Sequence, residues 1–140
     1  MSKEIILKKI EQLKALLVEL EALLAKPLAD FSKDTVVIRA AERYFQLIVE
    51  LASDINTTLL VDKTGKTPDT YRQSFSDIEK LGVIDKELSG VMATSARLRN
   101  ILVHEYDFEE DNERFYTSAK QMMPSYQAYT VAILKYIQVI

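Results

Sequence analysis

The chain has 140 residues, of which 48% are hydrophobic and 28% charged, with a formal net charge of −3 and no cysteine. This length suits one domain with a sizeable core, and the missing cysteines exclude disulfides and thiolate metal sites. The net charge argues against a protein that coats nucleic acid, and no stretch reaches the ~18 consecutive apolar residues of a membrane span. We therefore expect one soluble domain over residues 1–140, in the cytoplasm and away from the membrane.

Two long amphipathic helices are predicted in the first half of the chain. Apolar residues in the first one step by four and three along one face, and Pro27 ends the run. The second helix begins near 32–34, where Ser32 or Asp34 can accept the free N–H groups of its first turn. The apolar face of the first helix carries Ile6, Ile10, Leu13, Leu17, Leu20 and Leu24. That of the second carries Val37, Ala41, Tyr44, Ile48, Leu51, Ile55 and Leu59.

The middle of the chain predicts a loop and two further helices. The segment 61–69 contains a glycine and a proline and is the clearest loop. A short helix follows at about 70–81, with Gly82 as its C-terminal cap. The next helix starts near Asp85 and shows one regular face, which consists of Leu88, Met92, Ser95, Leu98 and Leu102.

A last helix follows the polar segment 107–112. Its apolar face carries Phe115, Ala119, Met122, Tyr126, Tyr129, Ile133 and Tyr136. Pro124 falls inside this helix and is expected to kink it or split it in two. Alternation of period two is absent over any useful length, so we predict an all-α fold, an up-and-down bundle of four to five helices with a kinked last helix.

The segment 96–106 stands apart because it combines the only histidine, His104, with Arg97, Arg99 and Asn100. A histidine exchanges protons near neutral pH, and an arginine offers a fixed fork of donors that matches phosphate oxygens. Together these groups suit metal-free RNA cleavage. A proton leaves the 2′-hydroxyl, the oxygen attacks the adjacent phosphorus, and Arg99 stabilises the charge on the phosphoryl oxygens.

The spacing of the pair adds a constraint. Five residues on an ideal helix turn ~140° and rise ~7.5 Å, so Arg99 and His104 do not share a face, whereas Asn100 and His104 do. The pair converges only if His104 lies at a frayed helix end or if a second copy contributes. A twofold dimer would also supply two histidines, one as base and one as acid.

A purely structural interpretation competes with this one. A lone histidine on a helix is usually structural or merely exposed, and Arg97 and Arg99 are then surface residues paired with nearby acids. The acids between positions 105 and 111 form a solvated face in either interpretation, and they repel phosphate.

The motif Arg99-Asn100-Ile-Leu-Val-His104-Glu-Tyr106 resembles that of the HEPN domain family, and specifically of its HepT-like toxins. The resemblance extends along nearly the whole chain. It includes the leucine-rich first helix and the segments 40–46, 67–72 and 81–85.

The resemblance implies an RNA-cleaving toxin of a type VII-like toxin–antitoxin pair. Such proteins are homodimers that need neither metal nor cofactor, with Arg99 and His104 as the catalytic residues expected here. The partner it implies is an MntA-type nucleotidyltransferase antitoxin, which would transfer AMP to Tyr106. Adding a nucleotide there places bulk and negative charge beside His104 and so blocks RNA.

Other residues receive weaker assignments. We expect Asn100 and Arg97 to be auxiliary RNA or phosphate contacts, although Arg97 lacks the motif spacing to His104. Glu42, on the second predicted helix, matches a position that is often acidic in the family. It either orients an arginine or forms a surface salt bridge, and its role stays open.

Two other functions remain as alternatives. The chain can be a non-catalytic HEPN subunit that binds and supports a nucleotidyltransferase, and its net acidity fits a protein-binding surface. If the chain is a purely structural bundle, the motif of Arg99, Asn100, His104 and Tyr106 has arisen by chance. Loss of function on His104→Ala, with the dimer intact, favours the enzyme.

Overall fold

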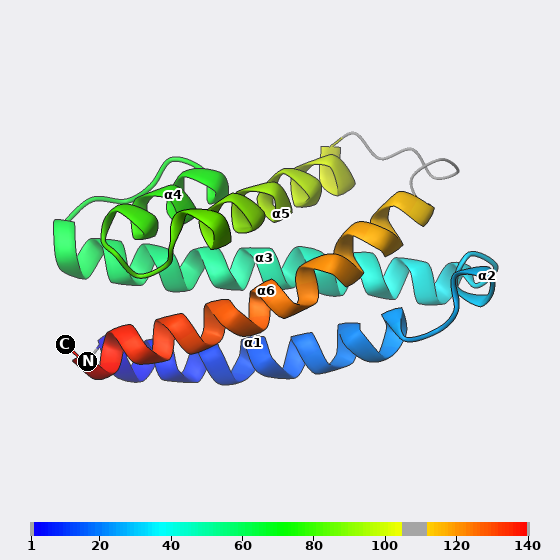
Figure 1. Cartoon of the computed structure of the whole chain (residues 1–140), viewed down its shortest axis with the longest axis horizontal. Coiled ribbons are helices and arrows are strands. Elements are labelled where there is room, and N and C mark those ends of the chain that lie inside the picture. Colours follow the sequence, from blue (N-terminus) through cyan, green and yellow to red (C-terminus); the bar gives the residue numbers. More distant parts are fainter. Residues whose placement is uncertain (1, 105–111, 140) are drawn as a thin grey trace.

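The computed structural model describes residues 2–104 and 112–139, and these residues form six helices (Figure 1). The helices are α1 (Ser2–Leu24), α2 (Leu28–Phe31), α3 (Thr35–Thr64), α4 (Tyr71–Lys80), α5 (Lys86–His104) and α6 (Asn112–Val139). The all-α prediction is confirmed. The count of four to five was short by one, because the four-residue α2 directly after Pro27 has no periodicity that a sequence pattern would reveal. No helix of the described segments is long and apolar enough to cross a membrane.

The long helices alternate in direction. In Figure 1, α1 and α5 run one way while α3 and α6 run the other, and the two chain ends lie together at one end of the bundle. Helix α3 is the central element, because it contacts each of the other five helices. The short α4 lies against both α3 and α5. The structure is therefore an up-and-down bundle with one short helix added to its side.

Side-chain caps fix three helix starts at the positions that the sequence predicts. The Asp34 carboxylate accepts from the backbone N–H of Val37 at 3.2 Å. The Thr70 hydroxyl accepts from the N–H of Gln73 at 3.0 Å, and the Asp85 carboxylate accepts from that of Leu88 at 2.8 Å. Each bond satisfies one N–H group that a first helical turn leaves unpaired.

Two glycines in left-handed conformation end helices. Gly82 has a φ of 83°, and the Val83 N–H donates to the Ile78 carbonyl at 3.0 Å, which is the Schellman arrangement for the end of α4. Gly65 ends α3 with a φ of 73°. The loop that we predicted from position 61 therefore starts only at Gly65, because residues 61–64 contain no helix breaker.

Pro124 does not split the last helix. Helix α6 is continuous from Asn112 to Val139, and in Figure 1 it is one ribbon that changes direction along its length. A proline inside a helix removes one backbone donor and its ring crowds the carbonyl of the preceding turn. The neighbouring Met123 and Tyr126 are both buried in the core, and this packing keeps the helix together.

The apolar faces that the sequence predicts form most of the core. All six residues of the α1 stripe are buried. On α3 the prediction was too narrow, because this helix is surrounded by others and buries a wider face. Half-buried members of the predicted stripe are Val37, Tyr44 and Leu51, whereas Ile38, Phe45, Val49 and Ala52 are buried outside it.

Candidate active site

Arg99 lies on the side of α5 that faces α3, where it forms an ion pair with Glu50. Its Nη2 and Nε both donate to Glu50 Oε2, at 3.0 Å and 3.3 Å. The Arg99 side chain is 16% exposed and the Glu50 side chain 29% exposed. Water screens such a pair less than it screens one on the open surface. Arg99 is thus held in one place by a charge on a neighbouring helix.

Two further contacts fix the guanidinium plane of Arg99. It lies over the ring of Tyr71, with 4.7 Å between the guanidinium carbon and the ring centroid, at a distance typical of cation–π stacking. On its other edge, Nη1 donates to the Asn100 Oδ1 at 3.1 Å. Glu50, Tyr71 and Asn100 therefore hold the side chain in one orientation.

A buried network of hydrogen bonds positions Tyr71. The Ser74 hydroxyl donates to the Tyr71 carbonyl at 2.6 Å and accepts from the Asn56 amide at 3.0 Å. The Tyr129 hydroxyl donates to the Asn56 Oδ1 at 2.6 Å. Burial raises the pKa of Tyr129 well above its usual value, so this phenol stays a neutral donor at physiological pH. The network joins α3, α4 and α6 beneath the site.

His104 is the last residue of α5 and is exposed. Because the helix is regular from Arg99 to His104, the two side chains project ~140° apart and ~7.5 Å along the axis. Within the described part of the chain no hydrogen bond joins them. Within the described residues, one copy of the chain does not bring the predicted catalytic pair together.

The surface hollow at Arg99 is not positively charged overall. Arg99, Asn100 and Tyr71 line it together with two acids, Asp54 and Asp69. Asp54 is 61% exposed and lies 3.9 Å from Lys9. Two carboxylates beside one arginine leave the hollow a poor binding site for an isolated phosphate.

The other residues that the sequence analysis singled out do not all lie at Arg99. Arg97 is exposed on another side of α5, while the Asn100 side chain lies beside Arg99. Glu42 is almost fully buried and accepts from Arg39 Nη1 at 3.0 Å, so among the described residues it orients neither Arg97 nor Arg99. Tyr106 lies outside the described residues.

Sequence reasoning missed Glu50 and Tyr71. Glu50 is 49 residues from Arg99, and no local spacing connects them. One signal was available, since Glu50 is a carboxylate inside the apolar run 47–52 of a helix. Such a charge in a half-buried position usually has a partner. Tyr71 gave no such signal.

Most of the chain matches a known protein family. Residues 6–133 match the family described as Ribonuclease HepT-like. A protein named tRNA nuclease HepT from Aphanizomenon flos-aquae is 39% identical over 88 residues, which is 61% of this chain and 59% of that protein. A protein named putative RNase from Archaeoglobus fulgidus is 32% identical over 90 residues, 64% of this chain and 61% of that protein. The chain thus spans about three fifths of the length of both relatives.

A solved structure shares the fold. It is a tri-AMPylated HEPN toxin of Shewanella oneidensis in complex with an MNT antitoxin. The TM-score is 0.83 at 22% sequence identity, and the superposition covers 94% of this chain and 97% of that one. At this identity the likeness establishes the fold alone.

Proposed function

The chain belongs to the Ribonuclease HepT-like family, and we propose that it is a metal-independent endoribonuclease toxin with Arg99 and His104 as its catalytic residues. The observation that carries this proposal is the fixed orientation of Arg99. Of the five N–H donors of a guanidinium, three are engaged by Glu50 and Asn100 among the described residues. Two remain, one on each terminal nitrogen, and they can form a fork for two phosphoryl oxygens.

In the proposed reaction an imidazole takes the proton of the 2′-hydroxyl, and the 2′-oxygen attacks the adjacent phosphorus. The bond from phosphorus to the 5′-oxygen breaks, and a second imidazole donates a proton to that oxygen. The products are a 2′,3′-cyclic phosphate and a free 5′-hydroxyl. Arg99 stabilises the negative charge that grows on the phosphoryl oxygens in the transition state. Asn100 serves as an auxiliary contact.

We infer that the active form is a homodimer. One chain has one histidine and holds it on a different side of α5 from Arg99. The α5–α6 surface has a groove whose lining includes Leu98, Ile101 and Leu102, together with Arg97 and Arg114. A second copy on this face would bury apolar surface and bring its own His104 to the common axis.

We further propose regulation by an MNT-type nucleotidyltransferase. The Shewanella oneidensis toxin is named as AMPylated and in complex with such an antitoxin, and the motif places Tyr106 two residues after His104. The Tyr106 phenol would attack the α-phosphorus of ATP, and pyrophosphate would leave. The bound nucleotide adds negative charge and blocks RNA. Toxin, RNA and antitoxin would meet in the cytoplasm.

The first test is cleavage of bulk transfer RNA by unmodified protein in the presence of EDTA. Wild type is expected to produce 2′,3′-cyclic phosphate ends, and His104→Ala is expected to lower the rate at least ~100-fold, because it removes the proton-transfer group. Product ends are read by enzymatic end-labelling, and an intact mass first confirms that Tyr106 carries no nucleotide. A dimeric, unmodified wild type that cuts none of several RNAs would instead support the non-catalytic binding subunit.

The dimer is tested by mixing subunits. Wild type and His104→Ala are co-refolded in varying ratios, and the cleavage rate is measured at constant total protein. If each site needs both histidines, activity follows the square of the wild-type fraction, so an equal mixture retains about a quarter of the full rate. A linear decline, or an active monomer in ultracentrifugation, contradicts the shared site.

Glu50 is expected to act as a positioning residue. Glu50→Gln keeps the shape but removes the charge that holds Arg99, so kcat is expected to fall about tenfold, which corresponds to ~1.4 kcal/mol. RNA affinity should stay the same or rise, because a carboxylate near the phosphate is lost. A merely destabilised protein would not show this split between kcat and affinity.

Glu42→Gln on the same helix is the matched control, since Glu42 contacts Arg39 rather than Arg99. It is expected to leave kcat unchanged. Equal losses in the two variants would mean that Glu50 contributes only to folding.

AMP transfer is tested with the cognate nucleotidyltransferase, ATP and Mg²⁺. The intact mass of the toxin is expected to rise in adenylyl steps, and RNA cleavage is expected to fall in parallel. Tyr106→Phe should show neither change while its fold, measured by circular dichroism, is kept. If the Tyr106→Phe protein is labelled to the same extent, the modified residue is not Tyr106.

A further inference from the structure

A charged groove lies between α4 and α5, next to the hollow that holds Arg99. Its charged lining consists of Arg72, Lys86 and Arg97, with one acid, Glu79. Three cations and one carboxylate give a local charge of +2, whereas the whole chain has −3. None of the three cations lies within ion-pair distance of a carboxylate among residues 2–104 and 112–139. The groove therefore offers positive charge that Glu79 offsets only in part.

Gly90, in the first half of α5, lines this groove. Gly90 has helical rather than positive φ, and a Cβ added there would meet nothing within 4 Å. Glycine inside a helix is less stable than alanine, and here neither the backbone conformation nor the packing within the chain calls for it. Its missing side chain leaves the helix backbone open to a molecule that enters the groove.

The groove is continuous with the hollow at Arg99. Thr70 and Asn100 line both of them. A linear polymer bound at Arg99 could therefore extend along the protein surface, past these two residues, into the cationic groove.

The same side of α5 also leads to the histidine. Arg97, Asn100 and His104 are spaced three and four residues apart, so they project along one face of the helix. The cationic groove and the hollow thus meet at Asn100, and His104 lies one turn further along the same face of α5. A polymer with a negative charge on every unit matches a groove of this kind, and single-stranded RNA has a phosphate on each nucleotide.

We propose that the groove between α4 and α5 is a phosphate subsite for RNA, in which Arg72, Lys86 and Arg97 bind the backbone next to the bond that is cut. This inference rests on the proposed function, since it takes the scissile phosphate to lie at Arg99. Glu79 limits the affinity, because its carboxylate repels the same backbone.

The test measures binding of bulk transfer RNA against salt concentration, in the full chain carrying His104→Ala so that nothing is cut. Removing two of the cations with Arg72→Gln and Lys86→Gln is expected to weaken binding about tenfold near 0.1 M salt. The slope of log affinity against log salt should fall by about 0.7–0.9 for each lost contact. Glu79→Gln should tighten binding.

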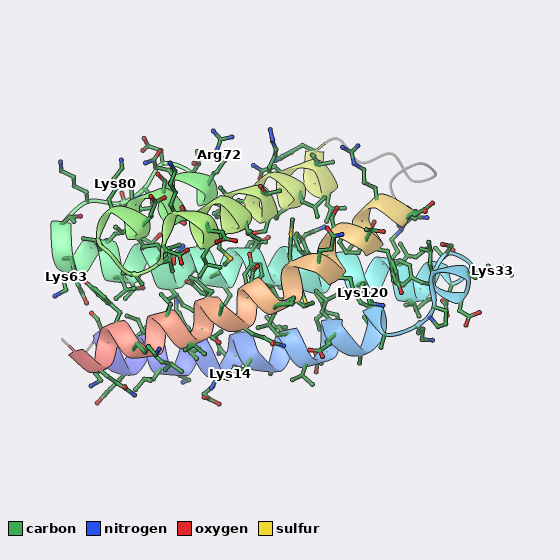
Figure 2. The ribbon with its side chains drawn as sticks, viewed as in Figure 1. Lys14, Lys33, Lys63, Arg72, Lys80 and Lys120 are labelled. Atoms are coloured by element: carbon green, nitrogen blue, oxygen red, sulfur yellow. The ribbon has the colours of Figure 1, made fainter. Side chains whose placement is uncertain are left out.

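The matched control removes two positive charges elsewhere, with Lys14→Gln and Lys33→Gln. Figure 2 shows Arg72 on one edge of the bundle and these two lysines away from it, on α1 and at the far end. The control is expected to change affinity less than twofold and to keep the salt slope. Equal weakening by both pairs would mean that only overall charge matters, and would overturn the subsite.

A neutral block separates binding from folding. Gly90→Gln fills the groove without changing charge and replaces glycine with a better helix former. The thermal midpoint is expected to stay or rise, while RNA affinity falls several-fold. An unchanged RNA affinity of Gly90→Gln would contradict the subsite. The subsite would also be wrong if the groove variants bound RNA normally but no longer bound the antitoxin.

Cleavage by the same variants without His104→Ala separates the two proposals. If wild type cuts RNA and the groove variants bind and cut equally well, the subsite is wrong and the proposed function stands. If wild type binds RNA through the groove but never cuts it, the subsite stands and the proposed function is wrong.

Discussion

The hydrogen bonds among Asn56, Ser74 and Tyr129 are the constraint on which the candidate site depends. Helix α4 has only ten residues, and a helix this short is marginal on its own. Its place is set by the burial of Phe75 and Ile78 and by the bonds of Ser74 to α3. Leaving one of these buried groups unpaired costs about 1–3 kcal/mol, a large share of the 5–15 kcal/mol typical of a domain. Because Tyr71 begins α4, the same bonds fix the ring under Arg99.

The Glu50–Arg99 pair has opposite effects on stability and on binding. A partly buried arginine without an acid nearby would favour conformations that reach water, so Glu50 keeps the guanidinium in the hollow. The same carboxylate reduces the positive charge that a phosphate meets, and Asp54 and Asp69 reduce it further. In the proposed active site, catalysis would depend on the orientation of Arg99 more than on attraction of the substrate. The attraction for RNA would then come from the groove of Arg72, Lys86 and Arg97, outside the hollow.

The fold was largely predictable because its signals are local. Apolar residues at helical spacing predicted the α1 face residue by residue, and Asp34, Thr70, Asp85 and Gly82 marked helix ends through bonds within one turn. What the sequence did not reveal depends on packing between distant segments. The continuity of α6 through Pro124 is of this kind, because it follows from the core on either side of the proline.

The candidate site was predictable only along α5. The motif identified Arg99, Asn100 and His104, since their chemistry and spacing lie within one helix. The acid that binds Arg99 could not be chosen from α3, which carries both Glu42 and Glu50. The two are eight residues apart, which on a helix is a turn of ~80° and a rise of ~12 Å, so only the three-dimensional packing decides which one meets α5.

In the homodimer that we propose, symmetry and RNA polarity together would explain how one histidine per chain fills two roles. In a twofold dimer the two His104 side chains are equivalent until a strand binds, and each copy presents its own cationic groove. A single RNA strand has a direction, so it cannot contact both grooves in the same way. The groove of one copy would bind the RNA on the 5′ side of the scissile bond, and the groove of the other copy would bind it on the 3′ side. The scissile bond would then lie between the two grooves. One histidine then faces the 2′-hydroxyl and the other faces the leaving oxygen. The roles of base and acid would thus be assigned by the substrate's direction rather than by any difference between the two chains.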